Sequence, residues 1–143
     1  MTNIYRLIIF IPFFFLGCAP NLIEENKVIQ KIDSLDMNIY SNNGDKIYSI
    51  SSPNSSYNIS ELKFELEKPI INIFKGEKTK YIISSEESTL SENNKILKLK
   101  GNVILKTLKE DEDILFADNF IWNIEETDYL LEGNIRFENQ NII

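Results

Sequence analysis

Three short acidic clusters and one cysteine carry the side chains of this sequence that could do chemistry. The clusters are Glu86–Thr89 (EEST), Glu110–Asp113 (EDED) and Glu125–Asp128 (EETD). Paired carboxylates can bind Ca²⁺ or act as a general acid and base, but no cluster has the EF-hand spacing of acidic ligands around a glycine. We interpret all three as solvated turns. Asp118 lies on an apolar segment, where we expect it to cap a turn or to hold a backbone donor.

The composition excludes several further classes of function. The chain has 143 residues, no His and a single Cys, so His-based triads, His metal sites and intramolecular disulfides are excluded. The formal net charge is -7 and the basic residues form no dense stripe. Nucleic-acid binding is therefore disfavoured, because it depends on clustered cations that neutralise phosphates. The sequence predicts one domain that is not an enzyme, with no catalytic residues, no metal site and no cofactor.

The single cysteine, Cys18, follows an apolar run of the kind found in export signals. One basic residue, Arg6, precedes the run over residues 7–16, and Gly17 follows it. This order is typical of a signal peptide, and a Cys directly after Gly resembles a bacterial lipobox, in which the thiol is lipidated. Alternatively, residues 4–19 stay uncleaved as an anchor, although they fall short of the ~20 residues of a spanning helix. Both alternatives predict a chain on the periplasmic side of a bacterial membrane.

Changes in composition and hydrophobic pattern divide the chain into three segments. Residues 1–17 are the signal peptide or membrane anchor, residues 18–36 a polar tether or short helix, and residues 37–143 the folded domain. In that domain, Asn42–Asp45 is a turn signal between two short apolar runs, which predicts a hairpin. Ser52–Asn58 (SPNSSYN) is predicted to be a loop because of its Pro, Asn and Ser content.

Beyond this loop, apolar and polar residues alternate as in strands with one buried face. Pro69 interrupts the alternation and indicates a bulge or a strand boundary. Leu97–Lys106 (LKLKGNVILK) and Tyr129–Glu138 (YLLEGNIRFE) repeat one pattern at a spacing of 32 residues, which aligns Gly101-Asn102 with Gly133-Asn134. Repeated strands and turns without interior helix signals predict an all-β sandwich, barrel or roll of stacked units. Each glycine is expected to permit a bend or a close backbone approach.

Three of these strand motifs follow one another in a distinctive order. Residues 69–74 (PIINIF) begin with proline, and residues 97–103 (LKLKGNV) contain the first glycine of the 32-residue repeat. Residues 115–122 (LFADNFIW) end with two aromatic residues, Phe120 and Trp122, separated by one position. This order resembles that of the LptC-type proteins of lipopolysaccharide export, which are related to LptA and OstA-like bridge domains. The resemblance covers roughly Met37–Asn139. LptC proteins usually keep an uncleaved transmembrane helix, so the lipobox-like Cys18 is a departure from the family pattern.

The resemblance implies both a fold and a ligand. The implied fold is an all-β, twisted open β-jellyroll of stacked antiparallel strands, preceded by the N-terminal signal or anchor segment. Its groove would bind the acyl chains of lipopolysaccharide through side chains on one face of the predicted strands, namely Phe64, Leu66, Ile71, Ile73, Leu97, Leu99, Val103, Leu105, Trp122, Tyr129, Leu131 and Phe137. The alternative is that these residues fill an ordinary packed core, as in a structural or assembly β-sandwich lipoprotein of the cell envelope.

The resemblance also implies partners for this domain. LptC-type proteins accept lipopolysaccharide from an inner-membrane ABC transporter and pass it to an LptA/OstA-like jellyroll protein through edge-strand pairing. The last predicted strand (GNIRFENQNII) runs to within a few residues of the end of the sequence. An uncovered apolar edge is either an aggregation hazard or a docking site. We expect docking if the chain is full length, and no nucleic-acid partner.

Overall fold

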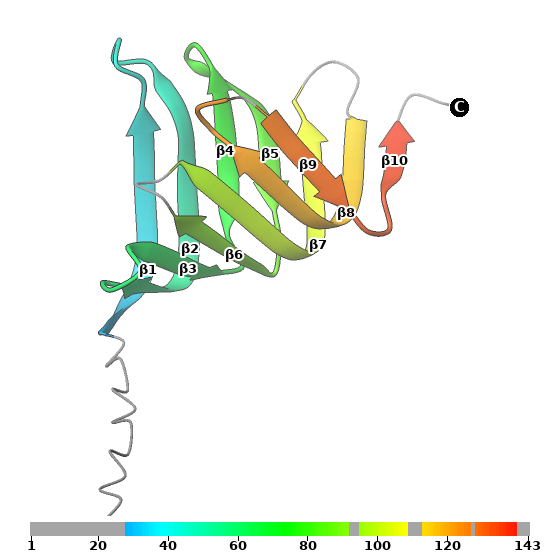
Figure 1. The fold of residues 1–143 in the computed structure, drawn as a ribbon. Coiled ribbons are helices and arrows are strands. Elements are labelled where there is room, and N and C mark those ends of the chain that lie inside the picture. The colour runs from blue at the N-terminus through cyan, green and yellow to red at the C-terminus, as the bar shows by residue number, and fades with distance from the viewer. Residues whose placement is uncertain (1–27, 92–94, 109–112, 127, 140–143) are drawn as a thin grey trace, which may run out of the picture.

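The computed structural model describes residues 28–91, 95–108, 113–126 and 128–139, and its regular elements there are all β-strands (Figure 1). The ten strands are β1 (Ile29–Tyr40), β2 (Lys46–Asn58), β3 (Lys63–Glu67), β4 (Ile70–Lys75), β5 (Lys78–Ser84), β6 (Glu87–Ser91), β7 (Ile96–Thr107), β8 (Asp113–Asn123), β9 (Asp128–Glu132) and β10 (Arg136–Asn139). The predicted signal or anchor over residues 1–17, with Cys18, lies outside the described residues.

All strand pairs are antiparallel, and several of them join strands that are not consecutive in sequence, such as β2 with β4 and β5 with β7. β1 pairs with β2, and β2 pairs with β3 along one half and with β4 along the other. β3 and β4 pair with β6 and β5, which in turn pair with the two halves of β7. β8 lies between β7 on one side and β9 and β10 on the other. The predicted fold class, an all-β antiparallel jellyroll, is confirmed.

The strands are interrupted along one line across the sheet, which we call the fold line. The pairing register aligns the residues of this line, which are Ser34, Pro53, Lys68-Pro69, Ser85-Glu86, Gly101-Asn102, Asp118 and Gly133-Asn134. Here β3 gives way to β4, β5 to β6 and β9 to β10, and the register between β7 and β8 shifts. Positive φ angles recur along the line, and they turn an otherwise extended chain.

The two Gly-Asn dipeptides adopt the same backbone conformation at this line. The φ angles are 78° and 44° at Gly101 and Asn102, and 70° and 31° at Gly133 and Asn134. Both residues of each dipeptide therefore lie in the left-handed region, which glycine and asparagine tolerate better than other residues. The expectation that each glycine permits a bend is confirmed.

An acidic residue from earlier in the chain packs against each corner glycine: Glu86, between β5 and β6, against Gly101, and Asp118, in β8, against Gly133. The side-chain amide of Asn102 donates a hydrogen bond to Glu86, and that of Asn134 donates one to Asp118 at 2.8 Å. The main-chain amides of the same two acids donate to the carbonyls of the corner glycines, at 2.9 and 3.2 Å. Glu86 and Asp118 are themselves 32 residues apart. The repeat therefore includes the acid, and the Asp118 carboxylate accepts from a side-chain amide instead of the backbone donor expected from the sequence.

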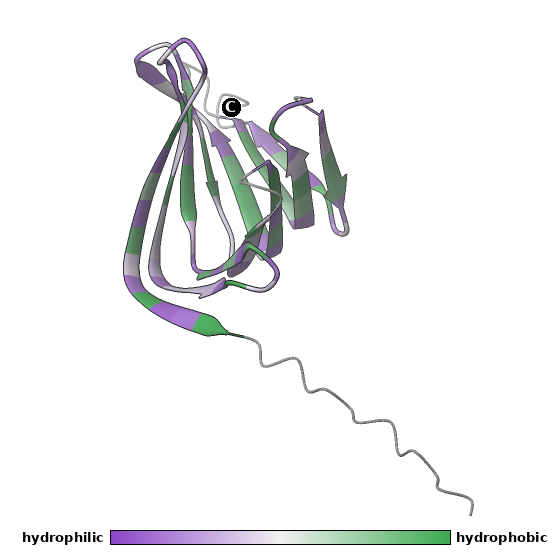
Figure 2. Cartoon of the chain, turned by 60° about the vertical axis from the view of Figure 1, so that its left-hand side comes forward, coloured by the Kyte–Doolittle hydropathy of each residue, from purple (hydrophilic) through white to green (hydrophobic). Residues whose placement is uncertain are grey.

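The bends fold the sheet into two layers that enclose the core. β3, β6 and β9 lie in one layer and β4, β5 and β10 in the other, while β2, β7 and β8 contribute one half to each (Figure 1). Hydrophobic and hydrophilic residues alternate along the strands (Figure 2). The inward side chains form one cluster of Tyr48, Ile50, Leu66, Ile71, Ile83, Leu90, Leu97, Leu99, Val103, Ala117, Phe120 and Trp122. Each large member contributes roughly 1.5–3 kcal/mol by burial.

The first strand corrects one prediction from the sequence. β1 begins at Ile29 and pairs with β2 along its length, so the tether or short helix predicted over residues 18–36 is wrong for residues 29–36. Leu35, Met37 and Ile39 of this strand pack against the core. Among the strands that the structure describes, β1 pairs with β2 alone, so the polar residues that suggested a tether are tolerated on its other side.

The predicted loop over Ser52–Asn58 is also wrong, because β2 continues through it to Asn58. Pro53 is tolerated in this strand because it lies on the fold line, opposite Ser34, where the ladder between β1 and β2 is interrupted. The turn comes later, where the side-chain oxygen of Asn58 accepts hydrogen bonds from the amides of Ser60 and Glu61 at 3.0 and 3.1 Å. The predicted hairpin around Gly44 and the strand boundary at Pro69 are confirmed.

Candidate functional site

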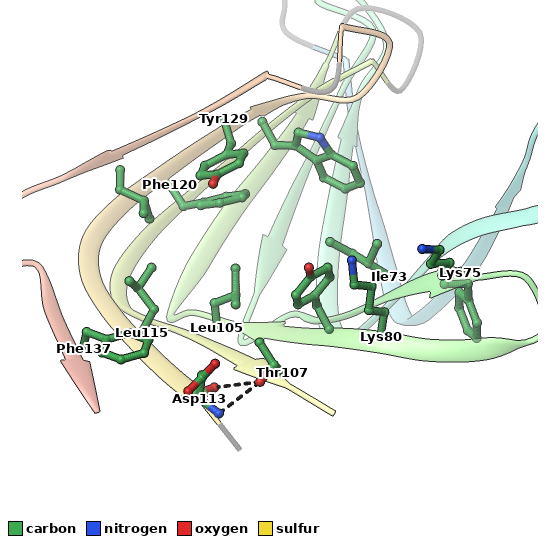
Figure 3. Close-up of a pocket in the computed structure, with 14 residues that line it drawn as sticks. Ile73, Lys75, Lys80, Leu105, Thr107, Asp113, Leu115, Phe120, Tyr129 and Phe137 are labelled. Carbon is green, nitrogen blue, oxygen red and sulfur yellow. Dashed lines mark hydrogen bonds between the residues drawn. The ribbon is translucent and has the colours of Figure 1, made fainter. Parts of the chain in front are cut away.

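A cavity of 630 Å³ lies between the two layers, on the side of the sheet that holds β8, β9 and β10. It is lined by Ile73, Phe74, Lys75, Lys80, Tyr81, Leu105, Thr107, Asp113, Leu115, Phe120, Trp122, Tyr129, Leu131 and Phe137 (Figure 3). Ten of these fourteen side chains are aliphatic or aromatic. The space is therefore an apolar trough rather than a polar cleft.

Aromatic rings from β8 and β9 form one wall of the cavity. Phe120 and Tyr129 stack with ring centroids 6.1 Å apart and an angle of 17° between their planes (Figure 3). The pairing of β8 with β9 places Trp122 opposite Tyr129 and Phe120 opposite Leu131. Trp122 is almost fully buried, whereas Tyr129 is 68% exposed. This wall therefore runs from the packed core out to solvent.

Aliphatic and aromatic side chains of the other layer form the opposite wall. Ile73 of β4 pairs with Tyr81 of β5, and Leu105 of β7 pairs with Leu115 of β8. Phe137 of β10 is the next partner of Leu115, and it is 60% exposed. Since exposed rings lie on both walls, the cavity opens to solvent along the side of β9 and β10.

The four polar lining residues gather at the outer ends of β4, β5, β7 and β8. The backbone amide of Asp113 donates to the Thr107 hydroxyl at 3.0 Å (Figure 3). Asn139 donates from its side chain to the Asp113 carboxylate at 2.6 Å. Lys75 and Lys80 lie together on the β4–β5 hairpin. The polar groups thus lie at one end of an otherwise apolar space.

This arrangement suits an elongated amphiphile better than a small polar substrate. The volume falls in the range of ligand pockets, and hydrophobic lining with a few placed polar groups is their usual composition. Apolar chains would gain roughly 25 cal/mol for each Å² of surface removed from water against these walls. Such a ligand could keep a polar head at the rim.

Comparison with known protein families decides between the possible classes of such a protein. A family model described as "Lipopolysaccharide-assembly, LptC-related" matches residues 17–142, nearly the whole chain. The chain belongs to the LptC-related family. Membership connects it with lipopolysaccharide transport and with proteins that face the periplasm from the inner membrane. LptC-related proteins are transport components and are generally not enzymes.

Two further comparisons bear on the LptC assignment. Among curated proteins, none matches the chain. No helix long and apolar enough to cross a bilayer occurs in the part of the chain that the structure describes. The segment that could carry the membrane anchor of an LptC protein, with Cys18, lies outside that part.

The twelve residues predicted to form the LptC groove divide into two groups. Six of them line the cavity: Ile73, Leu105, Trp122, Tyr129, Leu131 and Phe137. Leu66, Ile71, Leu97, Leu99 and Val103 are at most 2% exposed and lie in the packed core, and Phe64 packs against that core. The interior of the protein therefore contains both a cavity and a packed core, and the predicted residues are divided between these two regions.

Several cavity residues were not among the predicted groove residues. Phe120 and Leu115 lie in the motif that indicated the family, and Tyr81 shares the alternating pattern of Ile83. These three could have been found by extending the inward face of each strand. Lys75 and Lys80 carry no such signal, because lysines beside a turn are usually solvated.

The edge formed by β9 and β10 exposes apolar side chains. Within the described residues, each of these strands pairs only with β8. Leu130 and Ile135 are 52% and 57% exposed, in addition to the two cavity rings on the same strands. A strand that is paired on one side only and carries exposed apolar side chains can accept a strand from another protein along its other edge.

Proposed function

We propose that this LptC-related protein holds the acyl chains of lipopolysaccharide in the cavity between its layers and moves the lipid onward without chemical change. The observation that carries the proposal is the open, apolar 630 Å³ space in a chain of this family. Its aromatic and aliphatic walls supply the dry surface that acyl chains require. The protein would accept the lipid from the inner-membrane ABC transporter of lipopolysaccharide export.

The edge of β9 and β10 supports a direction for the transfer. The cavity opens beside this edge, since Tyr129 and Phe137 belong to both features. A jellyroll protein of the LptA/OstA type that added a strand there would bring its own interior next to the cavity. Edge-strand pairing would then make two troughs continuous.

Photocrosslinking in cells that export lipopolysaccharide tests lipid binding. A photoreactive phenylalanine analogue at Phe137 or Leu131 is expected to give lipopolysaccharide adducts that depend on an active transporter. The matched control is Lys98, an exposed residue on the outward face of β7, which should give none. Adducts at neither cavity position would contradict the proposal and favour a structural or assembly lipoprotein with a packed interior.

The docking edge is tested separately with the same analogue at Leu130. We expect adducts to the periplasmic jellyroll partner from Leu130 and none from Lys98 in the middle of the sheet. Adducts of equal yield from both positions would reflect random collision instead of strand addition.

The anchor is a further proposal, because Cys18 lies outside the described residues. We propose that Cys18 is lipidated after cleavage behind Gly17. Growth with radioactive palmitate should label the wild-type protein and leave Cys18→Ser unlabelled. Equal labelling of the two proteins would exclude lipidation at this thiol and favour the uncleaved N-terminal anchor.

A further inference from the structure

We infer that Lys75 and Lys80 form a cationic rim that binds the anionic head group, phosphate or carboxylate, of the amphiphile whose chain occupies the cavity. This inference rests on the proposed function and adds a chemical class to it. The two lysines belong to the β4–β5 hairpin and line the cavity together with the apolar side chains (Figure 3).

The two ammonium groups lack a carboxylate partner within the described residues. Lys80 places its Nζ 4.7 Å from the ring centroid of Tyr81, which is itself a lining residue. Asp113 is the one carboxylate among the lining side chains, and its carboxylate already accepts a hydrogen bond from Asn139. Glu77, in the turn between β4 and β5, forms no ion pair with either lysine in the described part of the chain.

Among the described lysines, Lys31, Lys63 and Lys95 form ion pairs with carboxylates. Lys63 lies 2.8 Å from Glu65, and Lys95 lies 2.8 Å from Glu125. The sequence has 22 acidic residues against 15 basic ones, so carboxylates are plentiful. Lys75 and Lys80 belong to the larger group of described lysines that form no ion pair, and they are the two lysines that line the apolar cavity.

A third ammonium group adds to the same rim. Lys46 of β2 lies with its Nζ 4.5 Å from the ring centroid of Phe74, another lining residue. The hairpin end of this layer thus holds several positive charges around aromatic faces. Charge–charge attraction is stronger next to a low-dielectric wall than in open water, so an anionic head group would be favoured over a neutral one.

The lone tryptophan gives a direct measurement of this preference. Trp122 is the single Trp of the sequence and lines the cavity, so a brominated chain bound there should quench its fluorescence. We would titrate the full-length protein, held in amphipol, with dodecanoic acid brominated at its terminal carbon and with the matching brominated dodecanol. The first probe carries an anionic head and the second a neutral one on the same chain.

The variants separate head-group binding from chain binding. Lys75→Gln/Lys80→Gln should weaken binding of the anionic probe by about tenfold and leave the neutral probe unchanged. Lys98→Gln/Lys100→Gln removes the same charge from the outward face of β7 and should change neither affinity. Lys75→Arg/Lys80→Arg should restore binding of the anionic probe.

Each outcome supports or overturns a defined claim. An unchanged affinity for the anionic probe in the Gln variant, or an equal loss for both probes, overturns the cationic rim while the cavity remains a chain-binding site. Failure of both probes to quench Trp122 in the wild-type protein overturns the proposed function together with the rim. Thermal unfolding of each variant, compared with the wild type, identifies any loss that comes from misfolding.

Discussion

Single residues set the curvature of this sheet at its two Gly-Asn corners. A Cβ atom added to Gly133 would lie 2.8 Å from the Cβ of Asp118, closer than real side chains approach. The glycine is therefore required by the neighbouring acid as well as by its φ angle of 70°. At this corner the Asp118 carboxylate lies against the backbone of Gly133, where it accepts a hydrogen bond from the side-chain amide of Asn134.

Substitution of Gly133 should separate these two requirements. Gly133→Ala is expected to lower the free energy of unfolding by about 2 kcal/mol or more, since it combines left-handed strain with a clash. Gly76→Ala is the matched control, because Gly76 has a φ of 65° and no atom within 4 Å of an added Cβ. Its cost should stay near ~1 kcal/mol. Equal losses in urea unfolding would mean that the contact with Asp118 is unimportant.

Tyr48 makes the stability of the core depend on pH. Burial raises the pKa of its phenol to about 12, and its ring meets that of Trp122 edge-on at 5.6 Å. In the unfolded chain the phenol ionises near its ordinary pKa of 10, so stability is complete below pH 10 and falls as the pH rises toward 12. The loss should reach roughly 2–3 kcal/mol.

Urea unfolding followed by Trp122 fluorescence between about pH 8 and about pH 12 measures this effect. Tyr48→Phe should remove most of the decline over the same range. A variant that declines as steeply as the wild type would assign the effect to other tyrosines or lysines.

At the scale of elements, β1 is the strand whose role is least evident from its sequence. Three of its inward side chains, Leu35, Met37 and Ile39, pack against the core while most of its other residues are exposed. An edge strand pairs on one side only and covers the rim of the core. It therefore needs fewer apolar residues than a central strand.

The packing of β1 predicts a measurable contribution to stability. Met37→Ser should lower the free energy of unfolding by about 1–2 kcal/mol, because it removes a half-buried apolar side chain. Asn38→Ser, on the exposed face of the same strand, should cost less than ~0.5 kcal/mol. Similar unfolding midpoints for both variants would indicate that β1 does not hold the core.

The central strands could be predicted from the sequence, whereas the first strands could not. In β7 and β8 the alternation is strong because these strands are paired on both sides and pack one face against a dense core, so Leu97, Leu99 and Trp122 are recognisable. In β1 and β2 the polar residues and Pro53 suggest a tether and a loop. These strands form because the fold line interrupts the ladder where proline needs no partner, a tertiary effect that local pattern does not contain.

The residues of the candidate site could likewise be predicted only in part from the sequence. Alternation identifies which side chains face inward, so half of the predicted groove residues do line the cavity. It cannot tell an inward residue of the packed core, such as Leu99, from one that lines the cavity, such as Leu105. That distinction depends on how far the two layers have separated at each position, which is set by the bends.

On the scale of the whole molecule, the interior has a closed end and an open end. Ile71 and Ile83 are fully buried near the fold line, while Tyr129 and Phe137 remain largely exposed where the cavity opens. Dense packing at the closed end stabilises the fold, whereas the open end offers accessible apolar surface to a ligand.

Two truncations should separate these ends. Ile71→Ala is expected to cost about 2–5 kcal/mol of unfolding free energy, since it leaves a hole in a packed region. Phe137→Ala should change stability by less than ~1 kcal/mol and yet weaken quenching of Trp122 by the brominated alcohol. A large loss of stability in Phe137→Ala would mean that the open end is part of the ordinary core.

The 32-residue repeat also bears on how such a protein could change in length. Each repeat is a two-strand unit with its own corner, and the next unit requires only the edge of the one before it. Neighbouring strands lie about 4.8 Å apart, so an in-frame duplication of one unit would lengthen the trough by about 10 Å. The reach of the trough along a lipid is thus a quantity that gene duplication can adjust in discrete steps, with no change to the existing core.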